Sequence, residues 1–205
     1  MALPHAAYEF HKWKSQLLWF DKILSILVIL LLGLFRPDWL LIAVFFLIIP
    51  YLVLTERTLL LHHLVAAFFI SLLWMVVARE EYAYNTAFIT IAGINLYPLF
   101  SWSVGLFTLY LLYSHYEHLL HKQTLSHKLL LFTGIYWPLL IFAETTAYHL
   151  FNIRNLATAA FPGLPLCDCI HAPLWMQITY FIIGIVFFVI CYALKLENPH
   201  HKIIK

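Results

Sequence analysis

The sequence predicts an all-α membrane protein, a single helix bundle over residues 1–205 that crosses the bilayer about six times. Three observations predict this class. The chain is 63% hydrophobic and 11% charged, whereas a water-soluble domain is roughly half apolar and about a quarter charged. Its mean hydropathy is +0.86. Its apolar residues are grouped into runs of about 20, the length at which a helix crosses a ~30 Å hydrocarbon core.

Short polar or proline-containing connections separate the apolar runs. Arg36-Pro37-Asp38 ends the first run, and its proline is a natural helix stop. The connections after the first and second runs are so short that these helices are expected to be antiparallel neighbours. The six expected spans cover residues 17–35, 39–54, 59–78, 84–113, 129–148 and 174–194.

Two segments depart from this simple pattern. The fourth run is longer than one crossing requires and contains Gly93 and Pro98, so we expect it to be interrupted there, with a short entry or re-entrant segment before the crossing helix. Residues 151–173 contain Pro162, Gly163 and Pro165, and we expect this stretch to be irregular or re-entrant.

The basic residues indicate an orientation. Cytoplasmic flanks of membrane spans hold an excess of lysine and arginine. With six crossings, Arg36, Arg79 and Arg154 lie on one side of the membrane. The other side then holds Lys12, Lys14, Lys22, Arg57, Lys122, Lys128, Lys195, Lys202 and Lys205. Both termini are therefore predicted to be cytoplasmic.

A faint internal repeat recurs at an offset of 70 residues. Asn85 matches Asn155. The same offset relates Gly93 to Gly163 and Tyr110 to Tyr180. Either an ancient duplication or chance similarity in a biased composition explains these pairs. A duplication predicts two three-helix halves, residues 1–113 and 114–205, with a cavity between them.

Glu144 is the main candidate for chemistry. It lies well inside the fifth expected span, with His149 about one turn further along. Ionisable groups at membrane depth are costly and are functional hypotheses by default. A carboxyl group at this depth is expected to hold its proton and to serve as a general acid. The alternative is a structural acid that is hydrogen-bonded to a neighbouring helix.

The segment from Cys167 to His171 offers a second group of polar residues. Asp168 lies in an apolar setting where it needs a partner, which Arg154 or a backbone donor could supply. Cys167, Cys169 and His171 suit a soft metal, but no fourth ligand is identifiable and apolar cysteines are usually just buried. We therefore expect neither a metal nor another cofactor.

The histidines and aromatic residues have simpler interpretations. The pattern His115-x-x-His118-x-x-His121 differs from a diiron histidine box, and we interpret it as a solvated loop. Most tyrosines and tryptophans lie near span ends, as an aromatic belt does. Trp137 lies deeper, where it either lines a cavity or packs in the core.

Two stretches resemble the membrane-embedded lycopene cyclase domain of carotenoid synthesis. One combines Tyr82-Ala83-Tyr84-Asn85 with Gly93-Ile94-Asn95-Leu96, and the other is Gly163-Leu164-Pro165-Leu166-Cys167-Asp168. The resemblance implies two three-helix repeats and ring closure of a linear polyene by protonation, with carboxylates as acid and base. Tyr97-Pro98 stand where the first copy of that family has its acidic pair, and the second copy retains only Asp168.

These observations favour a protein that binds or acts on an apolar isoprenoid or lipid by carboxylate acid–base chemistry. The competing hypotheses are a small transporter or channel component and a non-catalytic membrane assembly subunit. The expected partners are membrane lipids and an apolar ligand, and a net charge of +2 without a block of like charge argues against nucleic acid. The candidate catalytic residues are Glu144, His149 and Asp168, and the candidate ligand-binding residues are Tyr84, Asn85, Trp137, Arg154 and Asn155.

Overall fold

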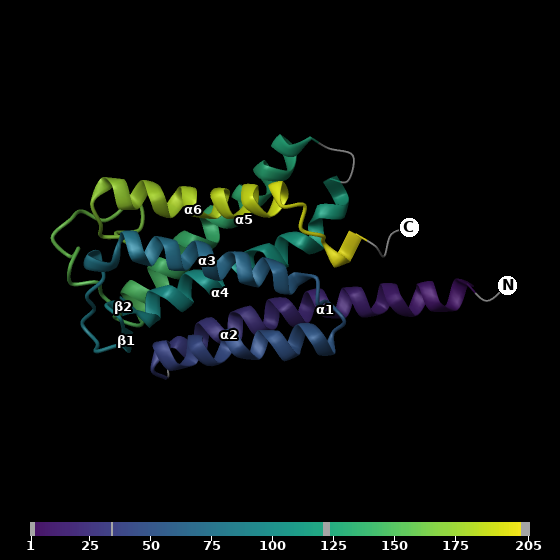
Figure 1. Cartoon of the computed structure of the whole chain (residues 1–205), viewed down its shortest axis with the longest axis horizontal. Helices are drawn as coiled ribbons and strands as arrows, with labels where there is room; N and C mark the ends of the chain where they lie inside the picture. Colours follow the sequence, from purple (N-terminus) through teal and green to yellow (C-terminus); the bar gives the residue numbers. More distant parts are fainter. Residues whose placement is uncertain (1–2, 34, 121–123, 202–205) are drawn as a thin grey trace.

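The protein folds as a bundle of long helices with almost no sheet, as the sequence predicts (Figure 1). The computed structural model describes residues 3–33, 35–120 and 124–201, with side chains for all of these except residues 3–15, 118 and 201. Its α-helices are α1 (Leu3–Leu32), α2 (Pro37–Leu54), α3 (Leu60–Val77), α4 (Leu96–Tyr116), α5 (Leu125–Thr145) and α6 (Leu174–Ala193). Its short elements are η1 (Arg79–Glu81), β1 (Thr90–Ile91), β2 (Ile94–Asn95), η2 (Glu117–Leu120), η3 (Thr146–Leu150) and η4 (Pro199–His201).

Helix α4 is the centre of the bundle. It contacts α1, α2, α3, α5 and α6, and most of its side chains are buried, including Trp102, Phe107 and Tyr113. The other helices bury a single stripe and leave a second apolar face outward. Leu47 of α2, Phe69 and Leu73 of α3, and Leu130 of α5 are each more than 60% exposed. A second, outward apolar face is what a helix needs when lipid is its solvent.

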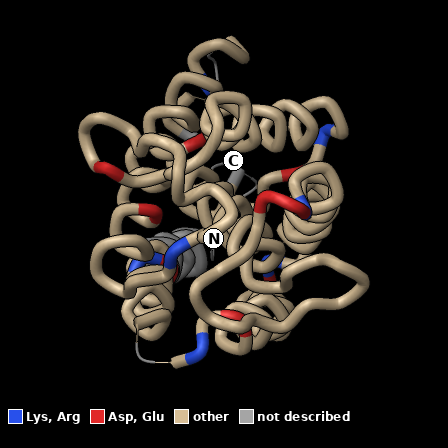
Figure 2. Tube along the Cα trace, turned by 90° about the vertical axis from the view of Figure 1, so that its left-hand side faces the viewer, with Lys and Arg blue, Asp and Glu red and all other residues tan. Residues whose placement is uncertain are grey.

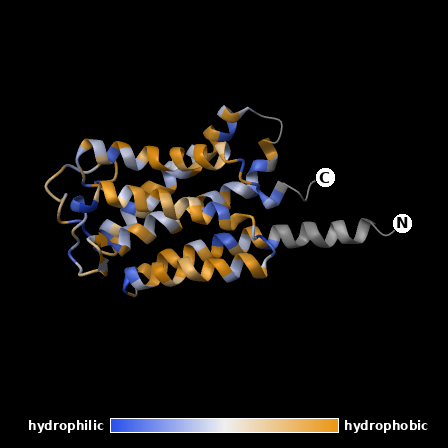
Figure 3. Ribbon diagram, in the orientation of Figure 1, coloured by the Kyte–Doolittle hydropathy of each residue, from blue (hydrophilic) through white to orange (hydrophobic). Residues whose placement is uncertain are grey.

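Five helices of the described chain are long and apolar enough to span a membrane. They are α2, α3, α4, α6 and the continuous helix of α5 and η3 over Leu125–Leu150. Apolar residues occupy the middle of the bundle and polar residues gather toward both ends (Figure 3). The protein is therefore a multi-pass membrane protein. Helix α1 runs beside α2 and is the expected sixth span.

Several boundaries differ from the sequence-based expectation. Helix α1 begins at Leu3, so it extends beyond the amino-terminal end of the expected span of residues 17–35. The short segment expected before α4 is an entry piece and contains the hairpin of β1 and β2, turned by Gly93 at φ +77°, a conformation that glycine adopts at little cost. Pro98 does not interrupt α4, because it lies in the first helical turn, where the missing N–H would have no intrahelical partner.

Two irregular segments meet at one end of the bundle. Residues 82–95 lead into α4, and residues 151–173, which are irregular as expected, lead into α6. Tyr84 and Asn155 form an isolated antiparallel bridge between them. Together with the connection between α1 and α2, these segments form the end that faces the viewer in Figure 2.

Candidate functional site

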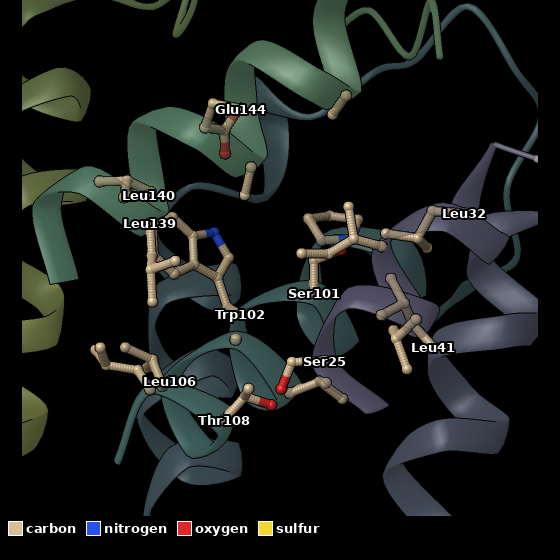
Figure 4. Close-up of a pocket in the computed structure, with 18 of the residues that line it drawn as sticks. Ser25, Leu32, Leu41, Ser101, Trp102, Leu106, Thr108, Leu139, Leu140 and Glu144 are labelled. Atoms are coloured by element: carbon tan, nitrogen blue, oxygen red, sulfur yellow. The ribbon is translucent and has the colours of Figure 1, made fainter. Parts of the chain in front are cut away.

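A cavity of about 470 Å³ lies between the helices, within the size range of small-molecule sites. Its walls come from α1, α2, α4, α5, η3, α6 and the irregular segments, and most of the lining side chains are aliphatic or aromatic. Leu139 and Glu144 of α5 face Ser101 and Trp102 of α4 across it (Figure 4). The cavity therefore presents an apolar volume with few polar groups.

Glu144 is the most unusual of these polar groups. Its carboxyl group lines the cavity, and within the described part of the chain it has neither a hydrogen-bond partner nor an ion-pair partner. The residue is half-buried, and a carboxyl group that is partly removed from water without a partner loses hydration free energy that no hydrogen bond replaces. The alternative predicted from the sequence, an acid hydrogen-bonded to a neighbouring helix, is not what the structure shows. Glu144 is available to a molecule that enters the cavity.

A cluster of aromatic side chains surrounds the same end of the cavity. Tyr82, Tyr84, Tyr97, Trp102 and Tyr180 all contribute to its wall. The Tyr82 hydroxyl lies at the centre of a hydrogen-bond network with Trp74, Trp102 and Tyr180. Burial raises the pKa of both Tyr82 and Tyr84 well above the ordinary tyrosine value. Both phenols therefore stay neutral and keep their protons.

The opposite end of the cavity reaches a second polar group. Asp21 and Ser25 of α1 and Tyr51 of α2 line it there. Asp21 is 1% exposed and accepts hydrogen bonds from Tyr51 at 2.6 Å, Arg57 at 2.8 Å and His115 at 2.7 Å. Unlike Glu144, Asp21 is fully paired, so it is suited to holding helices together.

The sequence did not predict this ion cluster. His115 was expected in a solvated loop, but it is 3% exposed and bonded to Asp21, because α4 continues to Tyr116 and carries it into the bundle. The His118 side chain and His121 lie outside the described residues. The signal that could have found the cluster is Asp21 itself, an aspartate within an apolar run.

The segment from Phe161 to Ala172 closes the cavity at the Glu144 end, where Ile170, His171 and Ala172 form part of the wall. Three backbone carbonyls of the segment accept hydrogen bonds from the Gln177 amide of α6. Cys167 and Cys169 form a disulfide within it. Because a disulfide offers no thiolates, Cys167 and Cys169 are not available in this state as the soft metal ligands considered above, and no described group of His, Cys, Asp and Glu has the arrangement of a metal site.

The other two candidate catalytic residues lie apart from the cavity lining. Asp168 is in the closing segment with its side chain 74% exposed, 3.4 Å from His171. It needs no buried partner, and Arg154, suggested as that partner, instead lies over the Tyr148 ring. His149 is exposed and its ring lies 2.9 Å from the carbonyl oxygen of Cys167. The structure therefore does not bring Asp168 and His149 to the cavity with Glu144.

Of the candidate ligand-binding residues, Tyr84 and Asn155 line the cavity, whereas Asn85, Arg154 and Trp137 do not. The side chains of Asn85 and Asn155 hold the two irregular segments together. Trp137 is 43% exposed on the outer side of α5 and donates to the carbonyl oxygen of Phe181 on α6. Asn85 and Trp137 therefore make hydrogen bonds within the fold and do not line the cavity.

The fold and the site together define a multi-pass helical membrane protein with an internal apolar cavity and one unpaired acid. Comparison of the chain with protein-family models, curated proteins and solved structures finds no match. The arguments that follow therefore depend on the geometry of the cavity and on the residues that line it.

Proposed function

We propose that the protein binds an apolar isoprenoid or lipid in the cavity and acts on it through Glu144. The observation that carries this proposal is the unpaired carboxyl group of Glu144 in the wall of an apolar cavity. A protein that only needed a packed core would gain stability by replacing this group with an apolar one. Retaining it at a cost in stability is typical of functional sites.

The surroundings of Glu144 suit proton transfer to an electron-rich ligand. A neutral carboxylic acid donates its proton to a double bond, and the resulting carbocation is positive. Aromatic faces attract positive charge, and Tyr84, Trp102 and Tyr180 line the same end of the cavity. The Glu144 carboxylate then removes a proton from a neighbouring carbon, so that the net reaction is an isomerisation or ring closure. One carboxyl group acts as both acid and base.

The resemblance to the lycopene cyclase domain family agrees with this chemistry and adds the class of ligand. That family also implies an acidic motif at the position of Asp168, but here Asp168 is exposed and does not line the cavity. The proposal therefore assigns proton transfer to Glu144 alone and gives Asp168 no part in it.

Occupancy of the cavity is tested with two matched glycine variants. Gly105 lines the cavity, and a side chain built there meets nothing within 4 Å. Gly134 of α5 is equally open but lies outside the lining. Mass spectrometry of lipids that copurify in nanodiscs should detect a bound isoprenoid or lipid in wild type and Gly134→Phe, and lose it in Gly105→Phe. Identical lipid profiles for all three would reject the cavity as the site.

The chemical role of Glu144 is tested by Glu144→Gln. The amide keeps the shape but has no acidic proton, so the bound molecule should remain while its product disappears, with turnover falling by about 10²–10⁴-fold. Glu80→Gln is the control, since the Glu80 side chain is 84% exposed at the bundle end. If Glu144→Gln formed as much product as wild type, Glu144 would have no catalytic role, although the proposed binding would stand.

A second function, transport of a small solute or proton, is favoured by a different observation. The cavity is lined by Glu144 near one end of the bundle and by Asp21 near the other, with Ser25, Ser101 and Thr108 in its wall (Figure 4). Sparse polar groups along an intramembrane cavity are typical of proton pathways. A pH-sensitive dye trapped in proteoliposomes would detect proton flux, and flux that Glu144→Gln abolishes would favour this function over the lipid site.

We also propose that both termini are cytoplasmic. Lys22, Arg57, Lys128 and Lys195 belong to the end of the bundle opposite the two irregular segments. Cytoplasmic flanks are enriched in such residues. The Cys167–Cys169 disulfide lies at the other end, consistent with an oxidising compartment there. Fluorescent-protein and alkaline-phosphatase fusions to each terminus in a bacterial inner membrane should give fluorescence and no phosphatase activity.

A further inference from the structure

The hydrogen-bond network of Tyr82 leaves one proton without an acceptor. Indole N–H groups only donate, and the Tyr82 oxygen accepts from Trp74 at 2.9 Å and from Trp102 at 3.3 Å. These two bonds use the acceptor capacity of that oxygen. The Tyr82 hydroxyl must therefore donate its own proton to the Tyr180 hydroxyl, which lies 2.8 Å away.

Tyr180 accepts this hydrogen bond, so its own O–H group still needs an acceptor. Within the described part of the chain, the Tyr180 hydroxyl has no partner besides Tyr82. Its side chain is 7% exposed, so bulk water does not supply an acceptor, and it lines the cavity together with Glu144. A buried donor without an acceptor is as costly as an unpaired acid.

The Tyr180 O–H proton has no acceptor, and the Glu144 carboxyl group has no partner. We therefore infer that the natural ligand is oxygenated, an isoprenoid or lipid with a hydroxyl or carbonyl oxygen that accepts a hydrogen bond from Tyr180. This inference rests on the proposed function and narrows its ligand class. A hydroxyl group satisfies both residues, because it accepts from Tyr180 and donates to Glu144. A carbonyl oxygen accepts from Tyr180 and from the neutral Glu144 acid. An unsubstituted hydrocarbon satisfies neither.

The network also explains how Tyr180 is held in place. Its ring packs against Trp102 at 4.8 Å and Trp74 at 6.1 Å between centroids, both edge to face. Tyr136 donates a hydrogen bond to the carbonyl oxygen of Tyr180. The donor is therefore fixed before a ligand arrives, which lowers the entropy cost of binding.

The test compares farnesol with farnesene, its dehydration product, which has the same C15 skeleton, one more double bond and no oxygen. Binding to purified protein in nanodiscs is followed by the fluorescence of Trp102 and the other tryptophans. Farnesol should bind about tenfold more tightly than farnesene, the ratio expected for one hydrogen bond to a buried partner. Equal affinities would overturn the inference and leave the cavity as a lipid site. If neither ligand bound, and the fluorescence of wild type and of Gly105→Phe responded identically, the proposed function would instead be rejected.

Variants assign the preference to Tyr180. Tyr180→Phe should lower the farnesol preference to about one, whereas Tyr113→Phe should keep it, since Tyr113 is buried outside the cavity lining. A preference retained in Tyr180→Phe overturns the assignment. If Tyr180→Phe fails to fold, infrared spectra of farnesal bound to Glu144→Leu decide the point, because a carbonyl stretch at the frequency found in lipid alone then means that Tyr180 does not donate to the oxygen.

Discussion

Asn85 and Asn155, which are 70 residues apart, each hydrogen-bond to the segment that contains the other. The Asn85 amide donates to the carbonyl oxygen of Asn152 at 2.7 Å, and its oxygen accepts from the Arg154 backbone at 3.0 Å. Asn155 repeats this arrangement toward the first segment, with Glu81 as acceptor at 2.6 Å and Ala83 as donor at 3.1 Å. The two asparagines thus form a reciprocal clamp between the chain before α4 and the chain before α6.

The clamp predicts graded losses of stability. Asn85→Ala removes two side-chain hydrogen bonds and should lower the free energy of unfolding by about 1–3 kcal/mol, at about 0.5–1.5 kcal/mol for each bond. Asn85→Asp keeps the acceptor and loses the donor, so its loss should be smaller. Thermal unfolding in detergent measures both, with Glu80→Ala as the exposed control. A loss in Asn85→Ala no larger than in the control would show that the clamp contributes nothing.

The ion cluster predicts a larger effect. Arg57→Leu leaves the Asp21 carboxylate buried with one cationic partner removed, and breaking a buried pair in this way costs about 3–5 kcal/mol. Replacing both residues by leucine should cost less than the sum of the two single variants, because no uncompensated charge remains. A double-mutant cycle from denaturant unfolding measures this coupling. Additive losses would argue against a direct interaction.

A larger residue at Gly184 is expected to disturb the packing between α5 and α6. A Cβ built on Gly184 overlaps the Tyr136 ring, so a larger residue must displace that ring or the helices that carry the two residues. Gly184→Ala should cost about 1–3 kcal/mol, as overpacking of a well-filled core does. Gly134→Ala is the matched control because its Cβ meets nothing within 4 Å. Unfolding midpoints in the same detergent compare the two, and equal midpoints would contradict the close contact.

The disulfide predicts a pattern of alkylation. The chain has three cysteines, and Cys191 is free and buried. Denatured protein that has not been reduced should therefore take up one alkyl group, and reduced protein should take up three. Intact mass spectrometry counts the groups. Three groups before reduction would show that Cys167 and Cys169 are thiols, and the possibility of a soft metal would reopen.

Composition and spacing were sufficient to predict the class of fold. Bilayer thickness sets the length of a helical span, and lipid excludes unpaired backbone, so apolar runs of about 20 residues report helices directly. The same local signals fail at boundaries. They gave the expected span of residues 17–35 without showing that its helix begins at Leu3, and they treated Pro98 as an interruption of α4, because the start of a helix depends on packing as well as on residue type.

The sequence by itself predicted that Glu144 lies within a helix long and apolar enough to span a membrane, because the residue stands inside an apolar run. Only the tertiary structure decided which groups share a site with it. Tyr180 joins Glu144 at the cavity, whereas Asp168 and His149 lie outside its lining. The buried pairing of Asp21 with Arg57 and His115 was equally invisible. The physical reason is that helix packing decides which buried polar groups become partners. It brings together residues that are far apart in the sequence, and nothing in their spacing indicates that they meet.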